Sequence, residues 1–351
     1  MIRLILYRAL IDLQKGPLGK FIAVKCVDLA RISPRLTVRM AISPSRDTVC
    51  RAARCLSVAF GLTLLSEMGA QASEQVQFPS LNGKLELTGL LDRPTRGLPG
   101  PAVVMMHGCS GLGSAKGPFA LYRDWRDLLV ANGFVTLMVD SAASRGFHET
   151  CTLDVKEQTD RMWAERPSDA YAALAFLQSQ SFVAPDKIAL MGWSQGGGVV
   201  LETIPTHSLG RPNPPPAHEF AAAIAFYPGL CADKRLAAHL DEPPQSWATS
   251  IPLLVLQGEA DNWTRAKPCE AFLCEAESRH SPVSFQIYPG AYHSFDAPGM
   301  PIHTVEAYRN NEWALIEGTN ETARSDARDR VIRFLAEHFG VKPAPQPSGK
   351  N

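Results

Sequence analysis

Short apolar segments alternate along this chain with stretches of helical periodicity, and this alternation most constrains its fold. The apolar segments are rich in β-forming residues and have the length of buried strands. They lie at residues 101–106, 134–140, 187–191, 220–227, 251–257 and 283–288, and the helical stretches lie at 119–131, 167–180, 195–204, 266–278 and 322–339. Strands that alternate with helices form a mainly parallel sheet with helices on both faces. The sequence therefore predicts an α/β fold.

The length of the chain indicates one main domain. The chain has 351 residues, 45% of them hydrophobic, and α/β folds of this size commonly form one domain. We expect this domain over residues 73–340, with a surface loop at the proline-rich residues 205–217 and a disordered tail at 341–351. Lysine plus arginine equals aspartate plus glutamate at 35 each, so no overall charge favours binding to nucleic acid or to an anionic membrane.

The first 72 residues have the pattern of a secretory leader. A basic stretch ending at Arg54 precedes an uncharged apolar run at 55–65, which is too short to span a bilayer. Small residues follow at Ala70-Gln71-Ala72, which predicts cleavage there and a periplasmic or secreted protein without a membrane span. The alternative is an amphipathic or membrane-anchored N-terminal helix. Counted from Met40 the leader has a more usual length, which makes residues 1–39 an upstream extension.

The most specific motif is Gly192-Trp193-Ser194-Gln195-Gly196, between a predicted strand and a predicted helix. A G-x-S-x-G turn in this context raises a serine hydroxyl above the sheet edge as a nucleophile, and its glycines are needed where the backbones crowd. The alternative is a glycine-rich turn that binds phosphate or nothing. Because an acid and a histidine follow in the right order, we interpret Ser194 as the nucleophile of an α/β-hydrolase fold.

Asp261 follows the predicted strand at 251–257, and His293 follows the one at 283–288. Together with Ser194 they have the chain order Ser, Asp, His of these hydrolases. A serine hydroxyl needs an imidazole to take its proton, and the imidazole needs a carboxylate to fix its tautomer. We therefore predict His293 as the base and Asp261 as its acid. The alternatives are Glu259 and Asp296 as the acid, and His107, His148 and His280 as the base.

The segment His107-Gly108-Cys109-Ser110-Gly111 follows the first predicted strand of the parallel sheet. A loop of this kind presents a backbone N–H to the oxyanion, and the residue after the nucleophile presents another. This predicts an oxyanion hole from the amides of Cys109 and Gln195. The segment lacks the Lys-Ser/Thr of a nucleotide-binding loop, and no C-x-x-C or H-E-x-x-H spacing supports a metal, so we expect neither cofactor nor metal.

These motifs, taken in order, make residues 78–339 resemble the dienelactone hydrolases and their exported relatives. The resemblance rests on HGCSG, Asp140-Ser141 with Arg145-Gly146, DAYAAL, GWSQG, GEADNWT and YPGAYHSFD. It implies hydrolysis of small carboxylic esters or lactones without a cofactor. Arginines of the family commonly hold a substrate carboxylate, and Arg145 matches that role here. Its alternative is a loop-bracing arginine.

One position departs from the best-known dienelactone hydrolases, which have a cysteine where this chain has Ser194. Their substrate therefore does not transfer with the fold. Three functions stay open: an esterase or lactonase, a peptidase-type hydrolase, and a non-catalytic binding protein. The complete set of triad and oxyanion residues disfavours the last. The peptidase type is disfavoured because the chain has no large N-terminal domain that would gate peptides.

Export changes the expected state of the cysteines. Five remain after removal of the leader, and an oxidising compartment favours disulfides among them. Their places relative to the predicted strands predict the pairs Cys109–Cys151 and Cys231–Cys269, with Cys274 free.

Overall fold

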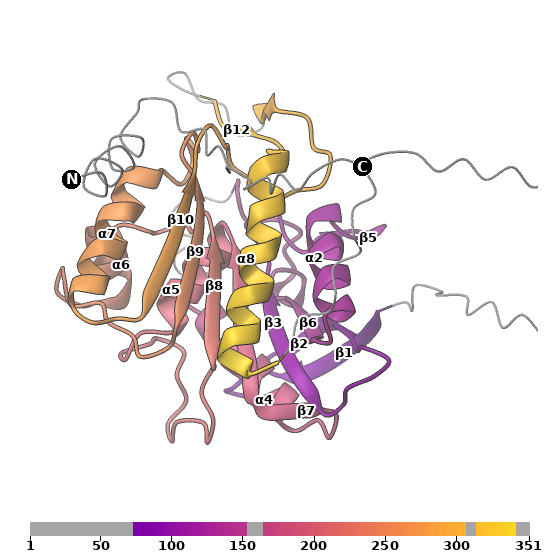
Figure 1. Cartoon of the computed structure of the whole chain (residues 1–351). Coiled ribbons are helices and arrows are strands. Elements are labelled where there is room, and N and C mark those ends of the chain that lie inside the picture. The colour runs from indigo at the N-terminus through magenta and orange to yellow at the C-terminus, as the bar shows by residue number, and fades with distance from the viewer. Residues whose placement is uncertain (1–72, 153–163, 307–313, 342–351) are drawn as a thin grey trace, which may run out of the picture. The chain divides into compact units, whose positions relative to one another are not determined.

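An eight-stranded sheet organises the computed structural model, which describes residues 73–152, 164–306 and 314–341 (Figure 1). The spatial order is β1-β2-β6-β3-β7-β8-β9-β10. The first two strands are antiparallel to their neighbours, and the other six are parallel to one another. The bounds are β1 (Glu74–Pro79), β2 (Glu86–Asp92), β3 (Gly100–Met106), β6 (Val135–Asp140), β7 (Val183–Trp193), β8 (Ala222–Phe226), β9 (Leu253–Gly258) and β10 (Val283–Tyr288).

Helices cover both faces of the sheet, as the alternation predicted. One face packs against α4 (Arg166–Gln178), α5 (Gln195–Thr203), α6 (Asp233–Leu240) and α7 (Ala266–Ser278), and the other against α2 (Ala120–Ala131) and α8 (Glu321–Phe339). Successive residues of β3 alternate between the two cores: Val104 belongs to the first, and Val103 and Met105 belong to the second. Burial on both faces explains why the parallel strands β3, β6, β8 and β9 are almost wholly apolar.

The last helix illustrates how local sequence sets an element's ends. The Asn320 side chain accepts from the Ala323 N–H (3.0 Å) and caps the start of α8, while Gly340 ends it with a φ of 63°. Lys187 Nζ, near the start of β7, donates to the carbonyl of Phe339 (2.9 Å). The helix therefore begins near the carboxyl edge of the sheet and ends at the opposite edge (Figure 1).

The six predicted strands and five predicted helices are present, with ends that differ by a few residues. The sequence patterns did not predict β1, β2 and α6. Short pairs also form between β4 (Gly113–Ser114) and β5 (Gly117–Pro118), and between β11 (His303–Thr304) and β12 (Ile316–Glu317), and η1 (Ala143–Arg145) is a 3-10 turn. Residues 205–217 contain no helix or strand, as predicted.

Two sequence predictions concern residues that the structure does not describe. The leader at residues 1–72 lies outside the described residues, as does nearly all of the predicted tail at 341–351. None of the helices within the described ranges has the length and apolarity needed to cross a membrane.

Candidate active site

Ser194 occupies a sharp turn between β7 and α5. Its backbone has a φ of 52° and a ψ of −115°, a conformation that residues other than glycine rarely adopt. A Cβ at Gly192 would lie 2.2 Å from the Gly196 carbonyl oxygen, and a Cβ at Gly196 would lie 2.1 Å from the Met106 carbonyl oxygen. Both glycines are therefore required by close backbone contacts, and the turn holds Ser194 at the carboxyl edge of the sheet.

Asp261 and His293 form a buried hydrogen-bonded pair, with 2.7 Å between Asp261 Oδ2 and His293 Nδ1. The exposed fractions of the two residues are 3% and 1%. Asp261 also accepts from the backbone N–H groups of Trp263 (2.8 Å) and Thr264 (2.9 Å) and from the Thr264 hydroxyl (2.9 Å). These donors fix the carboxylate, so that it orients the imidazole.

The loops that carry this pair are joined through their backbones. Ala260 N donates to the Ala291 carbonyl oxygen (3.0 Å), and a Cβ at Gly258 would lie 2.3 Å from that same oxygen. Parallel pairing of β9 with β10 brings the two loops to one edge. The register of two neighbouring strands therefore sets the contact between Asp261 and His293.

The alternative acids have other partners. Glu259 accepts from the Gly290 N–H (3.2 Å) at the surface. Asp296 is fully buried and accepts from Trp125 Nε1 (2.7 Å), Trp193 Nε1 (2.9 Å) and the Tyr227 hydroxyl (2.8 Å). Burial raises the pKa of the Asp296 carboxyl, whereas its hydrogen bonds act in the opposite direction. Asp296 therefore links the aromatic core beneath the turn and does not orient His293.

The alternative bases are also placed differently. His148 and His280 are exposed. His107 is buried, and 2.6 Å separates its Nδ1 from the Gly108 carbonyl oxygen. Burial, together with the nearby positive charge of Arg166, lowers the pKa of His107 to about 3. This histidine is therefore neutral at ordinary pH and belongs to the loop structure.

His293 lies among aromatic rings, with ring-centroid distances of 4.5 Å to Tyr227 and 4.9 Å to Trp263. Its Nε2 is buried and has no hydrogen-bond partner among the described residues. Ser194 N donates to the carbonyl oxygen (2.9 Å) of Phe226, which is the residue before Tyr227. The serine backbone and the histidine ring thus both contact the end of β8.

Cys109 and Gln195, the predicted oxyanion-hole residues, are linked through Thr150. The Thr150 N–H donates to the Cys109 carbonyl oxygen (2.7 Å), and its hydroxyl donates to Gln195 Oε1 (3.1 Å). Gln195 begins α5, where the first backbone N–H groups of a helix have no partner within it. The two residues therefore belong to one connected structure beside Ser194.

Both predicted disulfides are present. Cys109 is bonded to Cys151 with a Cα–Cα distance of 4.8 Å, and Cys231 to Cys269 with 4.6 Å. Cys274 has a free, exposed thiol. The first bridge joins the loop after β3 to the segment after Thr150, directly at the site.

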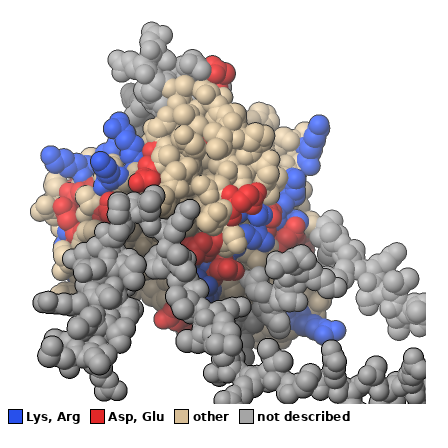
Figure 2. All heavy atoms as spheres, turned by 45° about the horizontal axis from the view of Figure 1, so that its top comes forward, with Lys and Arg blue, Asp and Glu red and all other residues tan. Residues whose placement is uncertain are grey.

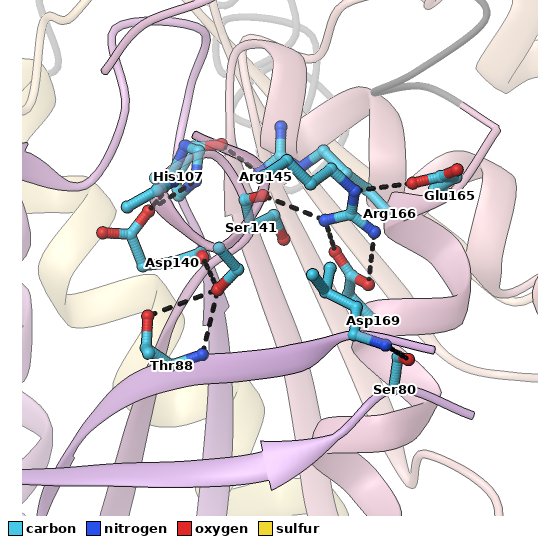
Figure 3. A network of polar contacts seen from close by, with 12 residues as sticks. Ser80, Thr88, His107, Asp140, Ser141, Arg145, Glu165, Arg166 and Asp169 are labelled. Carbon is cyan, nitrogen blue, oxygen red and sulfur yellow. Dashed lines mark hydrogen bonds and ion pairs between the residues drawn. The ribbon is translucent and has the colours of Figure 1, made fainter. Parts of the chain in front are cut away.

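Arg145 is held by carboxylates of the protein itself (Figure 3). Its guanidinium donates to both carboxylate oxygens of Asp169 (2.7 and 2.9 Å), to Glu165 Oε2 (2.6 Å) and to the Ser141 carbonyl oxygen (2.9 Å). Only 10% of its side chain is exposed. These contacts favour the loop-bracing interpretation over the substrate-binding one.

Sequence reasoning missed Arg166 and Thr150. Arg166 is fully buried and donates to Gln195 Oε1 (2.9 Å) and to the His107 carbonyl oxygen (2.6 Å). Its only sequence signal was its place before Pro167, at the start of a predicted helix. No rule of sequence spacing predicts contacts of an arginine or a threonine with residues far along the chain.

Uncharged residues fill the upper centre of the face shown in Figure 2, and acidic and basic side chains lie around them. Within the described ranges, no three His, Cys, Asp or Glu side chains are grouped so that they could hold a metal ion.

Known proteins resemble the chain over most of the described region. The model of the dienelactone hydrolase family matches residues 87–339. The chain is 30% identical over 136 residues to the quorum-quenching protein AidA of Acinetobacter baumannii (strain MDR-ZJ06), a match that spans 38% of this chain and 40% of that protein. It is 25% identical over 219 residues to a Bradyrhizobium sp protein named "Probable 2-oxo-3-(5-oxofuran-2-ylidene)propanoate lactonase", which spans 60% and 77% of the two chains.

Solved structures share the architecture. The apo form of Thermogutta terrifontis esterase 2 is similar with a TM-score of 0.55 and 20% identity, over 79% of this chain and 97% of the esterase. The propionate-bound form of that esterase gives a TM-score of 0.53 and 18% identity, over 79% and 98% of the two chains. At these identities the likeness concerns the fold alone.

Proposed function

This chain belongs to the dienelactone hydrolase family, whose model matches residues 87–339, and on that premise we propose that it hydrolyses small carboxylic esters or lactones through an acyl-enzyme on Ser194. The observation that carries this proposal is the buried Asp261–His293 pair, 2.7 Å apart, whose imidazole contacts Tyr227, the residue directly after the one that accepts the Ser194 N–H. A binding protein would have no need of a carboxylate-oriented imidazole next to such a serine.

The first step is attack by Ser194. Because Asp261 accepts a hydrogen bond at His293 Nδ1, that nitrogen carries the proton and Nε2 keeps its lone pair. Nε2 takes the hydroxyl proton while Ser194 Oγ forms a bond to the carbonyl carbon. The carbonyl oxygen becomes an oxyanion, which the N–H groups of Cys109 and Gln195 stabilise.

The second step releases the products. The imidazolium gives its proton to the leaving alcohol as the ester bond breaks, and the acyl group stays on Ser194. His293 then deprotonates a water that attacks the acyl-enzyme, and collapse of the second tetrahedral intermediate restores the serine. No step requires a metal or cofactor.

We propose substrates without a carboxylate of their own. The guanidinium of Arg145, which the family resemblance assigned to a substrate carboxylate, is held by Asp169 and Glu165. Freeing it would leave two carboxylates without their partner, one of which is buried. A panel of p-nitrophenyl esters, neutral lactones, carboxylate-bearing lactones and aminoacyl amides tests the substrate class and the peptidase alternative together.

The roles of the triad predict unequal losses of activity. Ser194→Ala and His293→Ala should each lower kcat by about 10⁴-fold or more, and the double variant should lose little beyond that because the two residues act as a unit. Asp261→Asn should keep somewhat more activity, since it disturbs orientation and leaves the attacking group in place. Steady-state kinetics with a short-chain p-nitrophenyl ester measure these rates.

A fluorophosphonate probe identifies the nucleophile directly. It should label the wild type at Ser194 and fail on Ser194→Ala. The matched control is Glu259→Gln, which changes an exposed carboxylate two residues from Asp261 and should leave labelling intact. Labelling of a different serine, or wild-type activity in Ser194→Ala, would show that the assignment is wrong.

We also propose that the mature protein works outside the reducing cytoplasm. Two disulfides support this, because such bonds persist mainly in oxidising compartments. The leader pattern in the first 72 residues points to the same location.

A further inference from the structure

The buried cation Arg166 connects the two halves of the proposed oxyanion hole. It is the first residue of α4 and is fully buried. Nη1 donates to Gln195 Oε1 (2.9 Å), on the residue after the nucleophile. Nη2 donates to the carbonyl oxygen (2.6 Å) of His107, in the loop after β3; Figure 3 labels both Arg166 and His107. One planar guanidinium thus holds helix α5 and the loop after β3 together.

Thr150 makes a second connection between the same parts. Its hydroxyl donates to Gln195 Oε1 (3.1 Å) and lies 3.3 Å from the Cys109 carbonyl oxygen, while its N–H donates to that carbonyl oxygen (2.7 Å). Thr150 is also fully buried. Gln195 Oε1 therefore accepts from both Arg166 and Thr150, and each donor also binds the loop that carries Cys109.

The charge of Arg166 has a further consequence. Among the described residues, its two hydrogen-bond acceptors are neutral, and Asp169 and Glu202 act on it only as nearby charges. Burial lowers the pKa of Arg166 to about 10, so the group remains protonated at neutral pH. A buried positive charge beside Gln195 and His107 favours negative charge that develops nearby.

We propose that Arg166 and Thr150 are positioning residues that hold the Cys109 and Gln195 amides at the separation a tetrahedral oxyanion requires. This inference rests on the proposed function. The two residues act through Gln195, His107 and Cys109 and do not touch the substrate. Because the oxyanion exists only in the tetrahedral states, loss of either residue should weaken binding of those states more than binding of the ester.

The experiment compares turnover with binding of a tetrahedral mimic. A short-chain alkyl trifluoromethyl ketone accepts the Ser194 hydroxyl at its carbonyl carbon, His293 takes the proton, and the ketone oxygen becomes an oxyanion. Its inhibition constant therefore reports on the oxyanion hole. We would measure this constant with kcat and KM for the wild type, Arg166→Met and Thr150→Val, and record thermal unfolding of each variant.

Arg211→Met is the matched control. The guanidinium of Arg211 also contacts α4, through the Tyr171 hydroxyl (3.2 Å). It pairs with Glu219 and, within the described part of the chain, has no hydrogen bond to Gln195 or His107. Its removal should alter stability without changing the ketone's inhibition constant.

Arg166→Met and Thr150→Val should each lower kcat by about 10- to 100-fold, less than loss of an oxyanion donor itself, and raise the ketone's inhibition constant by a similar factor. KM should change by about 3-fold or less, since the ester in its ground state does not depend on this spacing. Arg166→Lys keeps the charge but cannot reach both acceptors, so it should resemble Arg166→Met. If Arg166→Met does not fold, Thr150→Val decides.

Unchanged ketone inhibition in the folded variants would overturn the proposal, and so would full recovery in Arg166→Lys. Failure of the proposed function has a different signature. In that case the wild type itself would resist the ketone and the fluorophosphonate, before any variant is compared.

Discussion

Among single residues, His107 has a protonation equilibrium that folding changes strongly. An unfolded chain protonates this histidine near pH 6.5, whereas burial and the nearby Arg166 lower its pKa to about 3 in the folded protein. Between these values the unfolded chain binds a proton that the folded chain does not. The free energy of unfolding therefore falls as the pH falls through this range.

The predicted size of this effect is on the order of 1 kcal/mol per pH unit as the pH falls below about 6.5. His107→Asn removes the titrating group, and its amide can still donate to the Gly108 carbonyl oxygen. Urea unfolding of both proteins at pH 7 and pH 4.5 should show a smaller loss of stability in the variant on acidification. Equal losses would contradict the prediction.

At the residue scale, the order Ser, Asp, His disfavoured Asp296, which follows the histidine, and left Glu259 as a rival two residues from Asp261. The structure pairs Asp261 with His293, and the catalytic roles of the two residues stay a prediction. No rule of chain order applies to Arg166 or Thr150, whose contacts with Gln195 join residues 29 and 45 positions apart. Contacts of this kind depend on tertiary packing alone.

At the scale of elements, the contact between α5 and the end of β3 is unusually close. A Cβ added at Gly196 would lie 2.1 Å from the Met106 carbonyl oxygen and 2.5 Å from that of His107. Both oxygens belong to the backbone, so removing the clash would require α5 and the loop after β3 to move apart. The separation of these two elements therefore has almost no tolerance.

Gly196→Ala should lower the free energy of unfolding by about 1 to 3 kcal/mol, the usual cost of overpacking, although alanine favours a helix. The matched comparison is Gly108→Ala on the facing loop, where the nearest atom would be 3.4 Å away, an ordinary contact. Chemical denaturation should therefore separate the two variants, with Gly196→Ala the less stable. Equal stability would mean that the backbone yields more easily than the structure indicates.

Strands were predictable from the sequence where they form apolar runs rich in β-forming residues. All six such runs correspond to strands, including β10, which is only partly buried. Strand β1 is mostly exposed, with the sequence EQVQFP, and has no such run. Helix α6 has eight residues, too few to show a clear period.

For the whole molecule, the alternation of strands and helices predicted the architecture because a right-handed crossover and burial on both faces leave few other arrangements. The pairing of the cysteines was also predictable, since loops at one edge of a parallel sheet meet. The substrate was not, because it depends on side chains of loops that follow no period.

The proposed leader makes a prediction for the whole chain. Protein expressed in a Gram-negative host should appear in the periplasm with its N-terminus at or near Ser73 and both disulfides formed. N-terminal sequencing and non-reducing peptide mapping check the two features. An intact Met1 or Met40 in cytoplasmic protein would contradict the assignment of the leader.

The indole of Trp263 lies against His293, with centroids 4.9 Å apart and the rings inclined at 44°, so the charge of this histidine should act on the emission of that tryptophan. An imidazolium quenches the fluorescence of an adjacent indole more strongly than a neutral imidazole does. In the proposed mechanism, His293 is protonated only while a tetrahedral intermediate exists. The part of the tryptophan emission that Trp263→Phe removes should therefore fall while His293 is protonated, without a chromogenic substrate or an attached label.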